Sequence, residues 1–259
     1  MPRCWHKYVT PTFTDVEKGY YYVYVEEAVE NGWIKGYGDG RFGPEDKVTY
    51  AQMCVMLTTA FFKDTLDNYS GQKPWYVPYC NAGNDLGLLD GTAIQGKHTS
   101  EAEVSKHVSR YDMAQMVYNA MKAANKKMPT NIEIFNARMA TADWDAIPRN
   151  YRDAVDTCKA AKIINGIDNQ GTFAGDGPMT RAQAAIVLVK LSKIETSQEK
   201  PVDPDPVDPK PETPTEIERS PFAFKDSSET VGSMMRRLND EAPNYFEGYL
   251  IISLAKMPL

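Results

Sequence analysis

Two arginines each stand directly after a residue that is suited to begin a helix: Arg110 follows Ser109, and Arg181 follows Thr180. A helix N-terminus carries partial positive charge, so an arginine there costs about 0.3 kcal/mol or more. A bound carboxylate would offset that cost by accepting from the guanidinium fork and from free backbone N–H groups. The pattern predicts an anion-binding site at these four residues. The alternative is that each arginine pairs with an acidic side chain from another part of the fold.

Glycine-rich loops add groups that suit a sugar ligand. Gly38 and Gly40 allow positive φ and the close approach of a ligand to the backbone. Asp39 and Asp168 have carboxylates that accept hydrogen bonds from sugar hydroxyls. We therefore predict that these four residues shape a binding site. The alternative for each aspartate is a turn in which it caps its own backbone.

No arrangement of residues supports catalysis or a bound metal. His6, His98 and His107 pair with no candidate nucleophile, and no Gly-x-Ser-x-Gly, His-Glu-x-x-His or phosphate-loop motif occurs. The loop that starts at Asp39 fails as a calcium loop, because its twelfth position is Tyr50 rather than an acid. We predict that the chain is not an enzyme and has no catalytic residue, no metal and no cofactor.

The elements that must position these residues occur three times. Each copy has a helix-like stretch, a glycine, an irregular loop, and a Ser or Thr that opens a second helix (Gly36 with Thr49, Gly91 with Ser109, Gly166 with Thr180). Gln three residues after Thr49 and Thr180 completes a capping box, and the Asp after Ser109 is a weaker substitute. Each copy is therefore one unit of an internal repeat.

Three such units, each too short to bury its own apolar face, must share one core. We predict an all-α fold with units at 13–62, 69–124 and 140–193 (the first, second and third unit) in one domain over 10–195. The predicted arrangement is a pseudo-threefold helical prism around a shared three-helix core. An insertion at 125–138 lengthens the connection between the second and third units. Trp75 is the sugar-stacking candidate of the second unit, with core packing as its alternative; Tyr21 and Tyr22 take the comparable place in the first.

The composition changes after the third unit. Residues 196–218 are rich in proline and acid, which predicts an extended linker. Residues 219–259 regain a mixed apolar pattern with a short helix and a strand ("YLIIS"), and are expected to be part of a second domain or a tail.

Charge and apolar content exclude some partners. A net charge of −6 with a pI near 5.2 argues against nucleic acid. No run of about 18 apolar residues occurs, which predicts no membrane span, and the N-terminal stretch lacks the apolar segment of a signal peptide. Cys54 and Cys158 stand in apolar helical patterns and are expected to be buried free thiols.

The first and third units resemble the S-layer homology family. "FTDV" (13–16), followed by "AVENGWIKGYGDGRFGPEDKVTYAQM" (28–53), is similar to that family's unit, except that Tyr50 stands where the family has Arg. The third unit keeps Gly166, Asp168 and "TRAQ" (180–183), while the second keeps mainly Trp75 and "SRYD" (109–112).

The resemblance implies a function and a location. Such triplets anchor exported proteins non-covalently to pyruvylated secondary polysaccharide on the peptidoglycan of Gram-positive bacteria, so the chain is expected to be extracellular, in the cell wall or S-layer. Arg110 and Arg181 would clamp ligand carboxylates, and the Tyr50 site would be weak or absent. The alternatives are a module for self-association or protein contact with decayed sugar sites, and the anchor of a surface hydrolase whose catalytic domain lies elsewhere.

Overall fold

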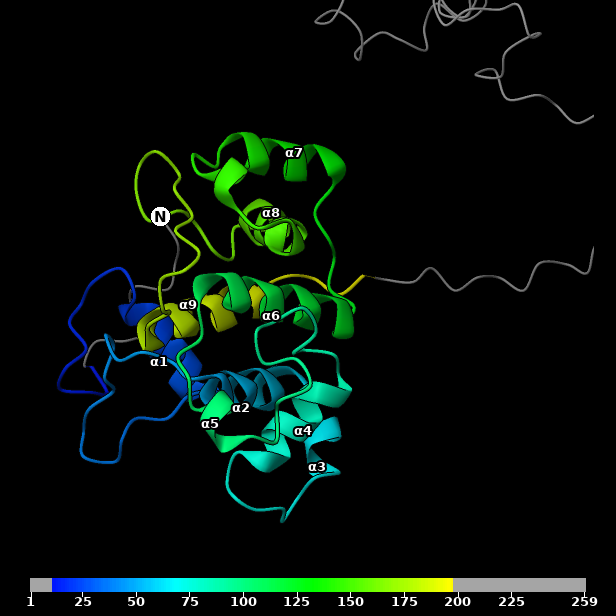
Figure 1. Cartoon of the computed structure of the whole chain (residues 1–259). Helices are drawn as coiled ribbons and strands as arrows, with labels where there is room; N and C mark the ends of the chain where they lie inside the picture. The colour runs from blue at the N-terminus through cyan, green and yellow to red at the C-terminus, as the bar shows by residue number, and fades with distance from the viewer. Residues whose placement is uncertain (1–10, 198–259) are drawn as a thin grey trace, which may run out of the picture. The chain divides into compact units, whose positions relative to one another are not determined.

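The computed structural model describes residues 11–197, and all of the regular structure there is helical (Figure 1). No strand occurs in this part of the chain, only isolated bridges. The all-α prediction is confirmed, and the predictions for residues 198–259 lie outside the described residues. The helices are α1 (Tyr22–Glu30), α2 (Tyr50–Phe61), α3 (Lys63–Asp67), α4 (Val77–Asp85), α5 (Glu101–Val104), α6 (Arg110–Ala123), α7 (Asn131–Met139), α8 (Arg152–Ala160) and α9 (Arg181–Ser192), with short 3₁₀ turns at Trp144–Ala146 and Arg149–Tyr151.

The three predicted helix starts are confirmed. Thr49, Ser109 and Thr180 are the N-caps of α2, α6 and α9, and each hydroxyl accepts from the backbone N–H three residues later. Full capping boxes form where that third residue is Gln52 or Gln183. The Ser109 cap lacks the return bond, and its third residue, Asp112, uses its carboxylate elsewhere.

The segments just before these caps meet in a closed ring of backbone hydrogen bonds. Val48 N–H donates to the Met179 carbonyl at 2.9 Å, Met179 N–H to the Val108 carbonyl at 3.1 Å, and Val108 N–H to the Val48 carbonyl at 2.9 Å. All three side chains are buried. The ring holds the starts of α2, α6 and α9 together, so the groups that follow the caps lie at the junctions between units.

The helices also pack in a cyclic order. Each central helix packs on the first helix of the next unit: α2 on α4, α6 on α8, and α9 on α1. In Figure 1, α6 and α9 cross the middle of the molecule, with α2 below them. This order supports a pseudo-threefold arrangement. The full prism and the unit boundaries stay predictions.

The insertion contains a helix that the sequence analysis did not anticipate. Thr130 and Glu133 form a capping box that begins α7, which lies against α8. Arg138 of α7 forms an ion pair with the buried Asp156 of α8 at 2.9 Å. Cys54 and Cys158 are buried free thiols, as expected, and so is Cys80.

Candidate functional site

Two open grooves lie at junctions between units. Groove A, of about 380 Å³, lies between the loop 32–35, one face of α2, and the start of α4, and Arg181 reaches it from α9. The α2 face is Gln52, Val55, Met56 and Thr59, and an aromatic pair four residues apart, Trp75 and Tyr79, completes the groove. No acidic side chain lines it.

Groove B, of about 490 Å³, repeats this construction one junction further along. It lies between the loop 163–167 and one face of α9, and Arg110 reaches it from α6. The aromatic pair is Tyr20 and Tyr24, and the α9 face is Gln183, Ile186, Val187 and Lys190. No acidic side chain lines this groove either. The two grooves therefore share an arginine, a glutamine of the central helix and an aromatic pair in corresponding places.

Each arginine is anchored in the loop of another unit. Arg110 donates from Nε to the Phe173 carbonyl and from Nη2 to the Asn165 carbonyl, both at 2.8 Å. The equivalent bonds of Arg181 run to the carbonyls of Phe42 (2.9 Å) and Lys35 (2.7 Å). The two guanidinium groups also stack on aromatic rings of those loops, at 4.7 to 4.9 Å from the ring centres. The arginines thus join units as well as lining the grooves.

The protein partners of the two arginines are backbone carbonyls and not acidic side chains. Neither arginine forms an ion pair within residues 11–197, so the acidic partner of the alternative interpretation is not found there. Both residues are buried, and burial lowers the pKa of both guanidinium groups. A guanidinium has five N–H groups; the two carbonyls accept from two of them, and in Arg110 the Met179 sulfur accepts from a third. Each arginine therefore has donors left for an anion in its groove.

The third junction is filled by side chains of the protein itself. Tyr50, in place of an arginine, donates its hydroxyl to the buried carboxylate of Asp112, and Tyr151 donates to the same carboxylate at 2.8 Å. Asn119 donates to the Asp90 carbonyl at 2.8 Å, the position equivalent to Lys35 and Asn165. Asn119 thus makes one of the two loop-carbonyl bonds that an arginine makes at the other junctions, and Tyr50 brings no positive charge to the place of the arginine.

Comparison with known proteins identifies the repeated unit. The family model of the S-layer homology domain matches residues 12–54 and 141–185. The chain carries S-layer homology domains. These domains are binding and anchoring modules of the cell surface rather than catalytic modules, and they indicate a location at the cell wall or surface. The two matches fall in the first and third units, and the second unit lies between them.

A curated relative gives a second comparison. The chain is 25% identical over 185 residues to an endoglucanase of Bacillus sp. (strain KSM-635), and the match covers 69% of this chain. It covers 18% of the endoglucanase, so the chain spans less than a fifth of that protein's length. Within residues 11–197, no helix has the length and apolar character needed to cross a membrane.

The exposed aromatic pairs of the two grooves only partly match the sequence analysis. Trp75 lines groove A and is 60% exposed, so it does not pack in the core. In the first unit, Tyr22 is buried, and Tyr20 and Tyr24 line groove B instead of the expected Tyr21 and Tyr22. Tyr20 and Tyr24 have the same four-residue spacing as Trp75 and Tyr79. Aligning the two units by this spacing would have identified the tyrosine pair from the sequence.

The loop residues predicted for the site lie outside both grooves. Asp39 accepts from Arg41 and Asp168 from the Thr172 N–H, which is the turn-capping arrangement. Gly38 and Gly40 have φ of +85° and +86°, in these exposed loops. The hydroxyls of Ser109 and Thr180 serve as helix caps. None of the six lines groove A or B, and their contact with a ligand stays a prediction.

Two aspartates that the sequence analysis did not single out hold the loops in place. Asp15 accepts from the N–H groups of Phe42 and Gly43, both at 2.8 Å. Asp143 makes the same pair of bonds to Phe173 (2.6 Å) and Ala174 (2.9 Å). Asp15 belongs to the "FTDV" motif, so the motif's aspartate orients the loop whose carbonyl receives the arginine.

The hydrogen bonds of Asp143 predict that the stability of the fold decreases at acidic pH. Burial opposes ionisation of Asp143, but the two backbone hydrogen bonds outweigh it and hold its pKa below the usual value. A group with a lowered folded-state pKa stabilises the fold above its unfolded pKa of about 3.9 and loses this effect as pH falls below that value. We expect Asp143→Asn to lower the free energy of unfolding by about 1 to 2 kcal/mol at pH 7, and the gap to the wild type to narrow below about pH 4.

Urea unfolding at pH 7 and pH 3 measures the difference in the free energy of unfolding between Asp143→Asn and the wild type. Asp145→Asn, in the same turn and exposed, is the matched control, because none of the hydrogen bonds among the described residues uses its carboxylate. A gap that stays constant between the two pH values would show that ionisation of Asp143 contributes nothing.

Proposed function

We propose that this chain anchors an exported protein to the bacterial cell wall by binding pyruvylated secondary polysaccharide in grooves A and B. One observation carries the proposal: each groove combines an arginine with donors to spare, an exposed aromatic pair and no acidic lining residue. A pyruvate ketal supplies a carboxylate for the guanidinium, and a sugar ring supplies an apolar face for the aromatic side chains.

The charge of the whole chain supports a localised site. The net charge is −6, so an acidic polysaccharide is repelled by the chain as a whole. Binding then requires cations gathered where acids are absent, and each groove provides this. The third junction lacks the cation, which favours two sites rather than three.

Wall binding tests the proposal directly. We expect the full chain to sediment with Gram-positive sacculi that keep their secondary polysaccharide, and not with sacculi stripped by hydrofluoric acid. The double variant Trp75→Ala/Tyr20→Ala should weaken sedimentation by about tenfold, because it removes a stacking surface from each groove and binding to a polymer is multivalent. Both side chains are well exposed (60% and 68%), so their truncation should leave the fold intact.

Phe135→Ala is the matched control for this experiment. Phe135 is an exposed aromatic residue of α7 that lines neither groove, so its loss should not change sedimentation. Equal sedimentation of the full chain with intact and stripped sacculi would refute polysaccharide binding.

A second candidate function, protein contact or self-association, is favoured by one feature of α7. Ile132, Phe135 and Met139 lie on one face of this helix and are 64%, 53% and 70% exposed. If the stripped sacculi bind as well as the intact ones and Phe135→Ala weakens that binding, this candidate replaces the first.

A further inference from the structure

Groove B contains a second cation that no protein group neutralises within the described part of the chain. Lys190 lines the groove from α9 and is half-buried. Its side chain takes part in no ion pair, hydrogen bond or ring contact with residues 11–197, and burial lowers its pKa. Holding an ammonium group in a half-buried place without an acidic partner is unfavourable. A ligand that brings an anion would offset that cost.

The two cations of groove B come from different parts of its lining. The Nη1 atom of Arg110 is 3.6 Å from the sulfur of Met179, which directly precedes the cap of α9. Lys190 lies on the groove-facing side of the same helix, two turns beyond Gln183. Seven residues of α-helix span about 10 Å. The two cations therefore belong to different points along α9, where each can meet its own carboxylate.

Groove A has its second cation in a different place. At the position on α2 that corresponds to Lys190, groove A has the uncharged Thr59. Its lysine is Lys35, an exposed loop residue whose own carbonyl accepts from Arg181. Both cations of groove A therefore come from the arginine end, and its far end is neutral.

We propose that groove B selects a ligand with two carboxylates about 10 Å apart, as on separate acidic sugars of one polysaccharide chain, with Arg110 binding one and Lys190 the other. Groove A requires only one. This inference rests on the proposed function, since it specifies the spacing of the anions on the same class of ligand.

Methionine methyl groups allow the two grooves to be observed separately. Met56 lines groove A and Met179 lines groove B. The full chain, labelled with ¹³C at its methionine methyl groups, is titrated by NMR with a disaccharide that carries one pyruvate ketal and with a tetrasaccharide that carries two. Substitution of Met56 and of Met179 by leucine assigns the two reporter signals.

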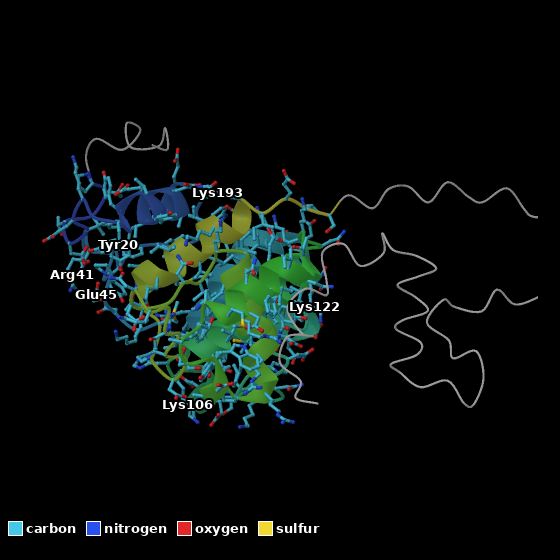
Figure 2. The ribbon with its side chains drawn as sticks, turned by 90° about the horizontal axis from the view of Figure 1, so that it is seen from above. Tyr20, Arg41, Glu45, Lys106, Lys122 and Lys193 are labelled. Carbon is cyan, nitrogen blue, oxygen red and sulfur yellow. The ribbon has the colours of Figure 1, made fainter. Side chains whose placement is uncertain are left out.

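We expect Lys190→Gln to weaken tetrasaccharide binding at the Met179 reporter by about tenfold, the effect of losing one charge-assisted hydrogen bond. Disaccharide binding at Met179 and all binding at Met56 should change less than about twofold. Lys122→Gln is the matched control, because Lys122 lines neither groove and lies on the opposite side of the ribbon from Tyr20 in Figure 2. Thr59→Lys should in turn raise tetrasaccharide affinity at the Met56 reporter.

The possible outcomes separate this inference from the proposed function. If both saccharides shift Met179 with unchanged affinity in Lys190→Gln, the two-anion selection is wrong and polysaccharide binding stands. A Thr59→Lys variant without gain at Met56 would contradict the inference independently of how Lys190→Gln behaves. If neither saccharide shifts either reporter in the wild type, both proposals fall.

Discussion

Replacing Arg181 by methionine is expected to lower the free energy of unfolding by about 3 kcal/mol, even with no ligand present. Arg181 is only 5% exposed, and its removal leaves the carbonyls of Phe42 and Lys35 without their donor. The stacking of the guanidinium on Tyr37 and Phe42 is lost as well. Arg110→Met should behave similarly, because Arg110 makes the same bonds to the third unit.

Urea unfolding of the full chain measures this effect. Arg149→Met is the matched control: Arg149 is exposed, so its loss should change the stability by less than about 0.5 kcal/mol. If Arg181→Met were as stable as the wild type and still failed to bind sacculi, the arginine would be a ligand contact only. Because the arginines are structural, loss of wall binding in an arginine variant proves a clamp only when the fold is shown to be intact.

Replacing Gly171 by alanine should be far more costly than the same change at Gly40. The two glycines stand two residues before Phe173 and Phe42, and their φ angles are +82° and +86°. Alanine at either position should lower the free energy of unfolding by about 1 to 2 kcal/mol, because the left-handed conformation is unfavourable for a residue with a Cβ atom. At Gly171 the new Cβ would also lie 2.3 Å from the carbonyl oxygen of Ala140, while at Gly40 nothing lies within 4 Å.

The two variants are compared by thermal or urea unfolding of the full chain. We expect Gly171→Ala to cost at least about 2 kcal/mol more than Gly40→Ala, since the backbone of the Ala140 segment must move. Gly40→Ala therefore serves as the control for backbone conformation alone. If both variants lost the same free energy of unfolding, the 140–143 segment would be able to move away from the new Cβ at little cost. Its contact with the third-unit loop would then not fix the loop.

Much of the fold could be predicted because its signals are local. A cap and its partner lie three residues apart, so Thr49 with Gln52 and Thr180 with Gln183 are readable from the sequence and are confirmed. The glycine, loop and cap order likewise gave the three units and the resemblance to the S-layer homology family. The capping box of Thr130 and Glu133 was equally readable, but the surrounding stretch lacked a repeat partner and its helix was not anticipated.

The site was predicted less completely because its contacts are long-range. Arg110 and Arg181 were singled out from the sequence and both line grooves, but their carbonyl partners were not foreseen. Their contact with a ligand stays a prediction. A carbonyl is present at every position of a sequence, so nothing in the residue types marks the ones that receive a guanidinium. For the same reason the role of Asn119, which takes the place of an arginine at the third junction, has no signature in the sequence.

The sequence alone determined the paired helices of the repeat, the caps at Thr49, Ser109 and Thr180, and the absence of an arginine at Tyr50, since each depends on residue type or on neighbours within one turn. Only the tertiary structure decided which residues meet. Arg181 bonds to carbonyls 139 and 146 residues away, and the ring of Val48, Val108 and Met179 joins all three units. The grooves exist because this ring closes, and closure depends on the whole chain.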